Sequence, residues 1–436
     1  MEKREENIKV IHRITKSSPA CFNGDNKCDD NGVFSNHDHI PIDLTRDILM
    51  RLPAKSIAKF RCISKLWWSI TTQPDFINSF VIRQSSIPRQ NLLITFIEKG
   101  NGMNQIFCVL PIQKNSTRFF DVNNFHFILP PTKVYNYYTV SVNGLITFTT
   151  RTEIIIWNPT MKEHITFVKP KSSKCLRSFL GYDPMENTYK LLSLASSYKR
   201  GGKYQKPKIL TLGSQESSWR VINSSPDHDP SRKYYCINGV VYYRADTSLE
   251  EDRDYHSILP PLSKEILELR LKEIIMSFDV RSEQFKSIQI PGRKFQYESM
   301  LEESLMSYQG KVAWICYNSN IIKLWVLKDA EKQVWSENEF VLPLPQRDLP
   351  RIAWLRGATS TGEFIYVSGN APKNISAFYY DPVRKIIRSV KGIENEKFRG
   401  CYGSNDNFIS SIFLHAFPNH IENLMSLKSI MCSPFV

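Results

Sequence analysis

The sequence lacks the signatures of disulfide-linked, zinc-binding and membrane-spanning proteins. Its 436 residues contain nine cysteines, scattered from Cys21 to Cys432 with no CxxC pair. This odd number and spacing fit neither a disulfide framework nor a zinc site of the usual kind. No stretch approaches the roughly 18 to 20 consecutive apolar residues that a membrane span needs. We therefore expect a reduced, intracellular protein of the nucleus, the cytoplasm or both, with no membrane partner.

No motif of a familiar catalytic or cofactor site occurs either. GxSxG, HExxH, GxGxxG and the P-loop pattern are all absent. The stretch GATSTG, residues 357–362, has the wrong spacing for a nucleophile elbow and predicts a hairpin turn. Cys28, His37 and His39 lie in a polar segment without a clear fourth metal ligand. We expect no cofactor, no metal and no catalysis, although an enzyme whose catalytic groups converge only in the fold remains an alternative.

The amino-terminal residues 1–36 are polar and almost free of aromatic side chains. They contain no apolar stretch typical of a secretory signal, and their acidic residues are untypical of a transit peptide. Because such a segment buries too little apolar surface to order itself, we expect residues 1–36 to be disordered and dispensable.

Positive charge is in excess, and it is spread along the chain. The formal net charge is +14, of which residues 1–40 carry −1, residues 41–82 carry +3 and the remainder +12. A basic, well-solvated surface is the simplest interpretation. An acidic protein partner or a nucleic acid is the alternative, and binding to a nucleic acid would weaken steeply with salt.

Residues 37–84 predict a compact unit of three or four helices. Asp43 is a candidate amino-terminal cap for a first helix. After it, Leu44, Ile48 and Leu52 recur at helical spacing and form one apolar stripe. Pro53 is expected to end this helix, because proline lacks the N–H group and clashes with the preceding turn.

The rest of this unit continues the helical pattern. A second helix is predicted around residues 57–60, and a third over residues 63–70 with Ser64 as a candidate cap. A fourth begins at Pro74, since proline suits the first turn of a helix. A DNA-reading helix-turn-helix would expose polar base-reading side chains where its recognition helix starts. The third helix instead begins Ser-Lys-Leu-Trp-Trp, so we do not expect this unit to read DNA.

The helical unit has more apolar surface than so small a fold can bury internally. The surplus is predicted to face a partner protein, or else the domain that follows. We expect the unit and that domain to have separate cores.

The stretch IPIDLTRDILMRLPAKSIAKFRCISKLWWSI, residues 40–70, resembles an F-box, the module that docks onto a Skp-type adaptor. The shared features are Ile40-Pro41, Leu52-Pro53, Lys55-Ser56-Ile57 and the turn from Cys62 to Trp67; Ile63 and Trp68 depart mildly from the pattern. The resemblance implies that apolar residues of this stretch bind the adaptor, namely Pro41, Leu44, Ile48, Leu49, Leu52, Pro53, Ile57, Phe60, Ile63 and Trp67.

Residues 90–395 predict an all-β domain built from repeats. A glycine turn leads into a strand in SVNGLITFTT, CINGVVYYRA, SYQGKVAWICY and STGEFIYVSG, and a second strand ends in Asp or Asn, as in FYYDPVRKII. The spacing of these turns corresponds to a period near 45 to 50 residues, which is typical of propeller blades. We predict a β-propeller of about six blades, with a two-sheet sandwich as the alternative.

This β-region resembles the F-box-associated domain of plant F-box proteins, through GYDP…YK, WNP, FDVRSEQF and NGVVYY. Together the two resemblances imply a substrate receptor of an SCF-type ubiquitin ligase. In that role the F-box holds the Skp-type adaptor and, through it, a cullin-RING scaffold, while the β-domain binds an unknown target protein for ubiquitination. The receptor contributes proximity and orientation, and other chains do the chemistry.

Three further segments carry predictions. The basic stretch SYKRGGKYQKPK, residues 197–208, is interpreted as a solvated loop, with a nuclear address as the alternative. The charged insert at residues 246–271 is either a binding element on one face of the propeller or a neutral loop. The apolar and aromatic residues 396–436 are expected to close the β-domain.

Overall fold

The computed structural model describes most of the chain from Ile40 onward. The described residues are 40–87, 91–99, 103–111, 140–150, 152–172, 175–196, 205–214, 218–247, 273–292, 302–317, 321–342, 353–368, 376–390 and 415–431. The predicted tail at residues 1–36, most of the insert at 246–271 and part of the basic stretch at 197–208 therefore lie outside the described residues.

Four helices come first. They are α2 (Ile42–Met50), α3 (Ala54–Ile63), α4 (Lys65–Thr72) and α5 (Pro74–Ser86). Asp43 was predicted as a cap, but α2 begins one residue earlier, so its carboxylate lies in the first turn, where it still suits the helix dipole. Ser64 is confirmed as the cap of α4, since its hydroxyl accepts from the N–H of Trp67 at 3.4 Å. Pro74 is confirmed in the first turn of α5.

Six antiparallel sheets follow in the part of the chain that the structure describes. One has three strands, β1 (Asn91–Lys99), β2 (Met103–Pro111) and β23 (His415–Phe417), in the order β2-β1-β23. The next two are β3 (Ser141–Val142), β4 (Leu145–Thr149), β5 (Glu153–Asn158) and β6 (Glu163–Val168), and then β7 (Cys175–Asp183), β8 (Thr188–Ser196), β9 (Lys208–Thr211) and β10 (Arg220–Val221).

The remaining three sheets have four strands each, paired in chain order. They are β11 (Asp229–Ile237), β12 (Val240–Asp246), β13 (Glu273–Asp279) and β14 (Phe285–Gln289); β15 (Glu302–Tyr308), β16 (Lys311–Tyr317), β17 (Ile321–Asp329) and β18 (Val334–Val341); and β19 (Ala353–Ala358), β20 (Phe364–Ser368), β21 (Ser376–Asp381) and β22 (Ile386–Val390). A short helix, α7 (Lys428–Met431), lies near the carboxyl end.

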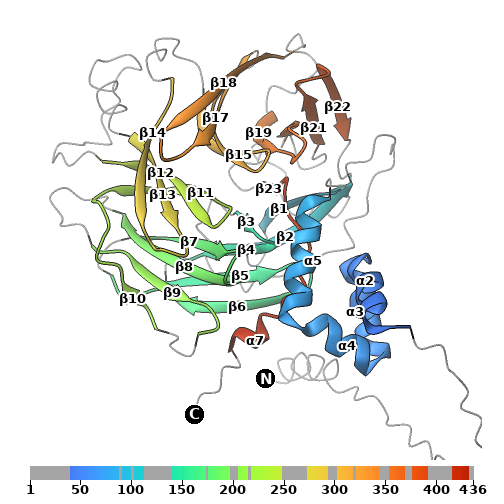
Figure 1. Ribbon diagram of the computed structural model, residues 1–436. Coiled ribbons are helices and arrows are strands. Elements are labelled where there is room, and N and C mark those ends of the chain that lie inside the picture. The colour runs from blue at the N-terminus through green and yellow to red at the C-terminus, as the bar shows by residue number, and fades with distance from the viewer. Residues whose placement is uncertain are drawn as a thin grey trace, which may run out of the picture. The chain divides into compact units, whose positions relative to one another are not determined.

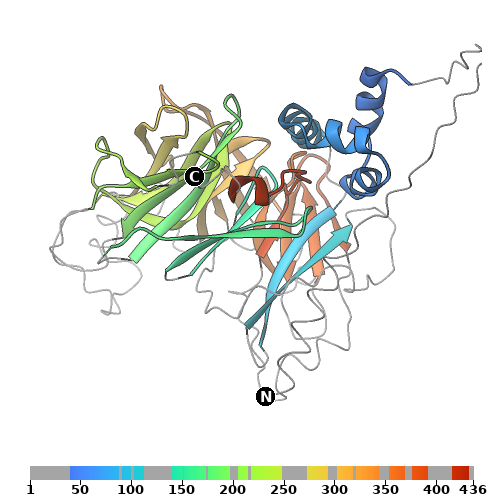
Figure 2. The same ribbon diagram turned by 90° about the horizontal axis from the view of Figure 1, so that it is seen from below.

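The sheets are the blades of a propeller. In Figure 1 they follow one another in chain order around a ring, and Figure 2 shows their strands crossing its thickness. The innermost strands touch in succession, β3 to β7 to β11 to β15 to β19 to β23. The ring closes where β23 pairs with β1, with Leu93 opposite Phe417. The predicted helical unit followed by a propeller of about six blades is confirmed, and the sandwich alternative is wrong.

Two kinds of turn account for the repeats seen in the sequence. Asn-Gly or Gln-Gly pairs with positive φ at both residues join the first two strands of three blades, as at Asn143-Gly144. In the second kind, an Asp or Asn side chain accepts a hydrogen bond from an N–H two or three residues later, and the fourth residue after it is left-handed. This second turn starts at Asn158, Asp183, Asp279, Asp329 and Asp381.

The core lies between neighbouring blades. Every residue of β4 is buried, because both faces of this strand are covered, whereas the outer strand β14 is mostly exposed. The Tyr234 hydroxyl, buried between two blades, accepts from the N–H of Leu180 at 3.1 Å and lies 3.0 Å from the Thr147 hydroxyl. Residues Arg46–Val436, which hold α3 to α5 and all strands, form one compact unit. No helix among the described residues is long and apolar enough to cross a membrane.

Candidate docking surface and its support

The helical unit is organised around a small apolar core. Its fully buried members come from all four helices and, unexpectedly, from the carboxyl-terminal segment: Leu49, Ala54, Ile57, Ile70, Phe76, Phe80 and Leu424. Phe60 and Trp67 pack at its edge with ring centroids 5.0 Å apart. The helices thus have a core separate from those of the propeller, as expected, but the carboxyl-terminal segment adds Leu424 to it.

The ten residues predicted to bind an adaptor fall into three groups. Pro41, Leu44, Ile48, Pro53 and Ile63 are exposed, and Ile63 is the most open of the apolar ones at 72%. Leu52, Phe60 and Trp67 are half-buried. Leu49 and Ile57 are buried in the core, so in this structure they shape the surface from beneath.

Helical spacing explains why neighbours in the sequence divide in this way. Ile48 and Leu49 are about 100° apart around α2, so only one of them can face the core. Other exposed apolar residues of this stretch lie outside the predicted ten, among them Leu66 and Trp68, at 48% and 56% exposure, and Ile40 and Ile42, at 57% and 60%. The signal for Trp68 was present, because it follows Trp67 directly and two adjacent aromatic residues cannot share one helix face.

Cations accompany the exposed apolar side chains. Lys55, Lys59 and Lys65 are exposed on α3 and α4. Arg61, by contrast, is tied down inside the unit, since its guanidinium donates to the hydroxyl and the carbonyl of Thr71 at 2.9 and 2.6 Å. Burial lowers the pKa of Arg61, and the nearby Glu163 carboxylate opposes that shift. The surface is therefore apolar and basic, which suits a partner with complementary apolar and acidic groups.

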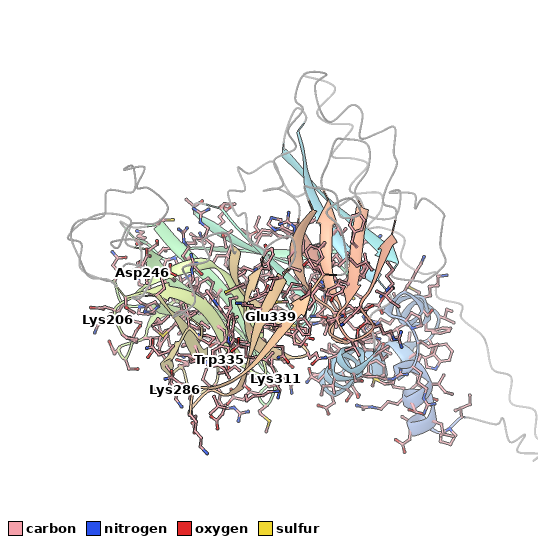
Figure 3. All side chains as sticks on the ribbon, turned by 90° about the horizontal axis from the view of Figure 1, so that it is seen from above. Lys206, Asp246, Lys286, Lys311, Trp335 and Glu339 are labelled. Atoms are coloured by element: carbon pink, nitrogen blue, oxygen red, sulfur yellow. The ribbon has the colours of Figure 1, made fainter. Side chains whose placement is uncertain are left out.

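Ion pairs also join neighbouring blades of the propeller. Arg281 lies 3.1 Å from Asp183, and Lys190 lies 2.9 Å from Glu283, which also bonds Arg220. Burial alone would raise the pKa of Asp183, but the N–H of Met185 and the Arg281 guanidinium outweigh it, so the pKa lies below its usual value. One interface further on, Lys286 of β14, labelled in Figure 3, lies 3.1 Å from Glu331.

Two bases on inner strands of the propeller have strongly lowered pKa values. Lys233 on β11 donates to the Ser304 hydroxyl at 2.7 Å. Burial, followed by the charges of Arg356 and Arg244, lowers the pKa of Lys233 to about 8. Burial and Arg356 also lower the pKa of His415 to about 3, so this imidazole is neutral at physiological pH. Perturbed groups often mark functional sites, but burial lowers the pKa of Lys169, just after β6, to about 8 as well, so Lys233 is not singled out.

The described residues were also searched for a metal-binding cluster of side chains. Among them, no group of three or more His, Cys, Asp or Glu side chains could hold a metal ion. The buried His228 is used structurally. Its Nδ1 lies 2.7 Å from the carbonyl of Pro226 and must donate there, so its Nε2 accepts from the Tyr243 hydroxyl at 2.7 Å.

Comparison with known proteins matches both parts of the chain. The family described as F-box domain matches residues 38–78, and the family described as F-box associated beta propeller domain matches residues 91–261 and again 262–421. A putative F-box protein of Arabidopsis thaliana is 37% identical over 409 residues, which cover 90% of this chain and 91% of the relative. A second one is 36% identical and covers 89% and 94%. Among solved structures, a luciferin-regenerating enzyme aligns over 58% of this chain and 75% of its own with a TM-score of 0.34 and 11% identity.

Proposed function

This chain belongs to the plant F-box proteins that carry an F-box-associated propeller domain, and we propose that it is the substrate-recognition subunit of an SCF-type ubiquitin ligase. Its F-box docks a Skp-type adaptor, which joins it to a cullin-RING scaffold in the nucleus or the cytoplasm. Its propeller binds a target protein and holds it for ubiquitination by other subunits. The chain itself performs no catalytic step in this proposal.

The exposed apolar side chains of the F-box carry the proposal. Ile48, Ile63, Leu66 and Trp68 are each about half exposed or more, although the unit has a core in which such residues are favoured. Large apolar side chains left open to solvent in this number favour a protein-protein interface. Exposed lysines on the same helices add a charge that an acidic adaptor surface would complement.

The topology of the propeller supports one end of it as the target-binding end. The turn at Asn238-Gly239 lies at one end of its blade, and β12 crosses from there to Asp246, where the insert at 246–271 joins. In Figure 3, Asp246 lies toward one end of the ring, and Lys286 and Lys311 lie toward the other. The short turns at the latter end include Asn143 and Asn158, which bond to the carboxyl-terminal segment. We therefore assign target binding to the opposite end, where the longer connections join the blades.

Reconstitution tests the proposal. The full chain is co-expressed with a Skp-type adaptor and mixed with a cullin-RING scaffold, and the complex is resolved by size exclusion. We expect one stable assembly that persists at 0.5 M salt or so, since apolar burial is little affected by screening. No assembly with any adaptor of the same plant, or an affinity for nucleic acid that falls steeply with salt, would overturn it.

A further inference from the structure

The carboxyl-terminal residues 421–427, here called the clamp, contact both the docking helices and the propeller. They follow β23, the strand that closes the ring. Some side chains of the clamp contact the docking helices, and their neighbours in the sequence contact the propeller. The clamp therefore links the docking helices to the propeller at a second place, in addition to the chain connection between α5 and β1.

Two clamp residues face the helices. The Glu422 carboxylate accepts a hydrogen bond at 3.0 Å from the N–H of Ala54, the first residue of α3. This N–H has no partner inside the helix, and the amino-terminal end of a helix favours a negative charge. Leu424 is 1% exposed and belongs to the buried core of the docking helices.

The residue between them faces the propeller. The amide group of Asn423 donates to the carbonyl of Asn143 at 2.7 Å and to the hydroxyl of Tyr189 at 3.1 Å, and its N–H donates to the Thr160 hydroxyl at 3.0 Å. Leu427 is 1% exposed within the propeller core. The clamp is therefore anchored on both sides by buried groups.

Asn158, in the blade of β3 to β6, fastens the clamp to the propeller. Its Oδ1 accepts from the N–H groups of Thr160 and Met161, as the matching Asp does in the other turns of this kind. Its Nδ2 donates to the carbonyls of Asn423 and Met425, at 3.0 and 2.8 Å. A carboxylate could form the turn but could not donate these two bonds.

The internal repeat makes this difference informative. The four other described turns of this kind begin with aspartate, at Asp183, Asp279, Asp329 and Asp381, and asparagine stands only where the clamp binds. The turn itself needs only an acceptor oxygen at this position. The NH2 group of Asn158 is therefore needed only for the two bonds that it donates to the clamp. Asn158 is 0% exposed, so no solvent replaces them.

We propose that the clamp holds the docking helices in one fixed orientation on the propeller and that Asn158 is the positioning residue that locks it. The helices are thereby stabilised by a segment that follows the propeller strands in the chain, and they lose protection when the clamp is released. A fixed orientation would keep the distance between adaptor and target constant, and this benefit rests on the proposed function. The existence of the clamp does not depend on that function.

The test is hydrogen exchange of the full chain read by mass spectrometry. Asn158→Asp keeps the turn but sets a carboxylate against two carbonyl oxygens. We expect exchange to rise roughly tenfold in peptides covering residues 420–431 and α3, on the scale of an unsatisfied buried hydrogen bond. The matched control is Asp329→Asn, which keeps the acceptor of its own turn and should leave residues 420–431 unchanged.

A second pair of variants guards against a general loss of folding. Leu424→Ala should raise exchange in α3 and α5 by about thirtyfold or more, as for other buried leucines, and leave β15 to β18 protected. Leu427→Ala, the same change facing the propeller, should act on the neighbouring blades instead. Unchanged exchange in α3 after both Asn158→Asp and Leu424→Ala would overturn the clamp. Failure to bind any adaptor would overturn the proposed function alone, because exchange is measured on the free chain.

Discussion

Replacing Ile48 and Ile63 by alanine separates adaptor docking from folding. Both side chains are on the F-box and largely exposed, at 51% and 72%. Neither belongs to the buried core of the docking helices. A docking defect in this variant would therefore not arise from a damaged core, as it would for Leu49 or Ile57.

The size of the effect follows from the exposed fractions. Full burial of an isoleucine side chain is worth about 1.5 to 3 kcal/mol. Because 51% of Ile48 and 72% of Ile63 is open to be covered, each truncation costs about 1 kcal/mol or somewhat more. The two residues lie on different helices, so we add the costs and expect about 2 kcal/mol, which is roughly a thirtyfold weaker affinity.

The assay is titration calorimetry of the full chain with a Skp-type adaptor, with a thermal melt of the same sample. The double variant should melt within about 2 °C of the unchanged chain, because surface substitutions cost little stability. Ile82→Ala is the matched control, since Ile82 is 67% exposed on α5 but lies beyond the matched F-box. Equal affinities for the double variant and the unchanged chain, or an equal loss with Ile82→Ala, would refute the assignment of this surface.

Three further predictions concern the propeller. Asp183→Asn should cost about 1 to 3 kcal/mol at pH 7 by weakening the bond to Arg281. Because the folded pKa of Asp183 is below its usual 3.8, this stabilisation is full above that pH and disappears as pH falls through the folded value, so urea melts of variant and unchanged chain should converge only when the pH falls below that folded value. Gly292→Ala should cost about 2 to 5 kcal/mol, since its φ is +74° and the new Cβ would lie 2.5 Å from the Trp325 ring; an unchanged melting temperature would contradict this. Tyr234→Phe should cost about 1 to 3 kcal/mol in the same assay, because it leaves two buried polar partners unsatisfied, whereas a neutral effect would mean that solvent reaches them.

The local part of the structure could be predicted from the sequence because short-range physics decides it. Ser64 caps α4 and Pro74 starts α5, since a cap and a first turn depend on a few consecutive residues. The glycine and Asp turns predicted the blades for the same reason. Each turn needs a residue that adopts a left-handed conformation or a side chain that accepts a hydrogen bond. The F-box resemblance added the docking role, which periodicity alone would not have indicated.

Burial within the docking helices could be predicted only in part. The apolar stripe was visible, but the division between exposed Ile48 and buried Leu49 depends on which face of α2 meets the other helices. An apolar side chain is equally at home in a core or in an interface, so its type does not say which it serves.

Contacts between distant segments were decided by tertiary structure alone. Leu424 completes a core formed by residues more than 300 positions earlier, and β23 closes a ring begun by β1. No local pattern encodes such pairings, because they arise when the whole propeller brings its two ends together. Asn158 illustrates both kinds of determination. The sequence by itself determined that a turn begins at this residue. Only the folded chain places two carbonyl oxygens where the amide nitrogen of Asn158 can donate to them.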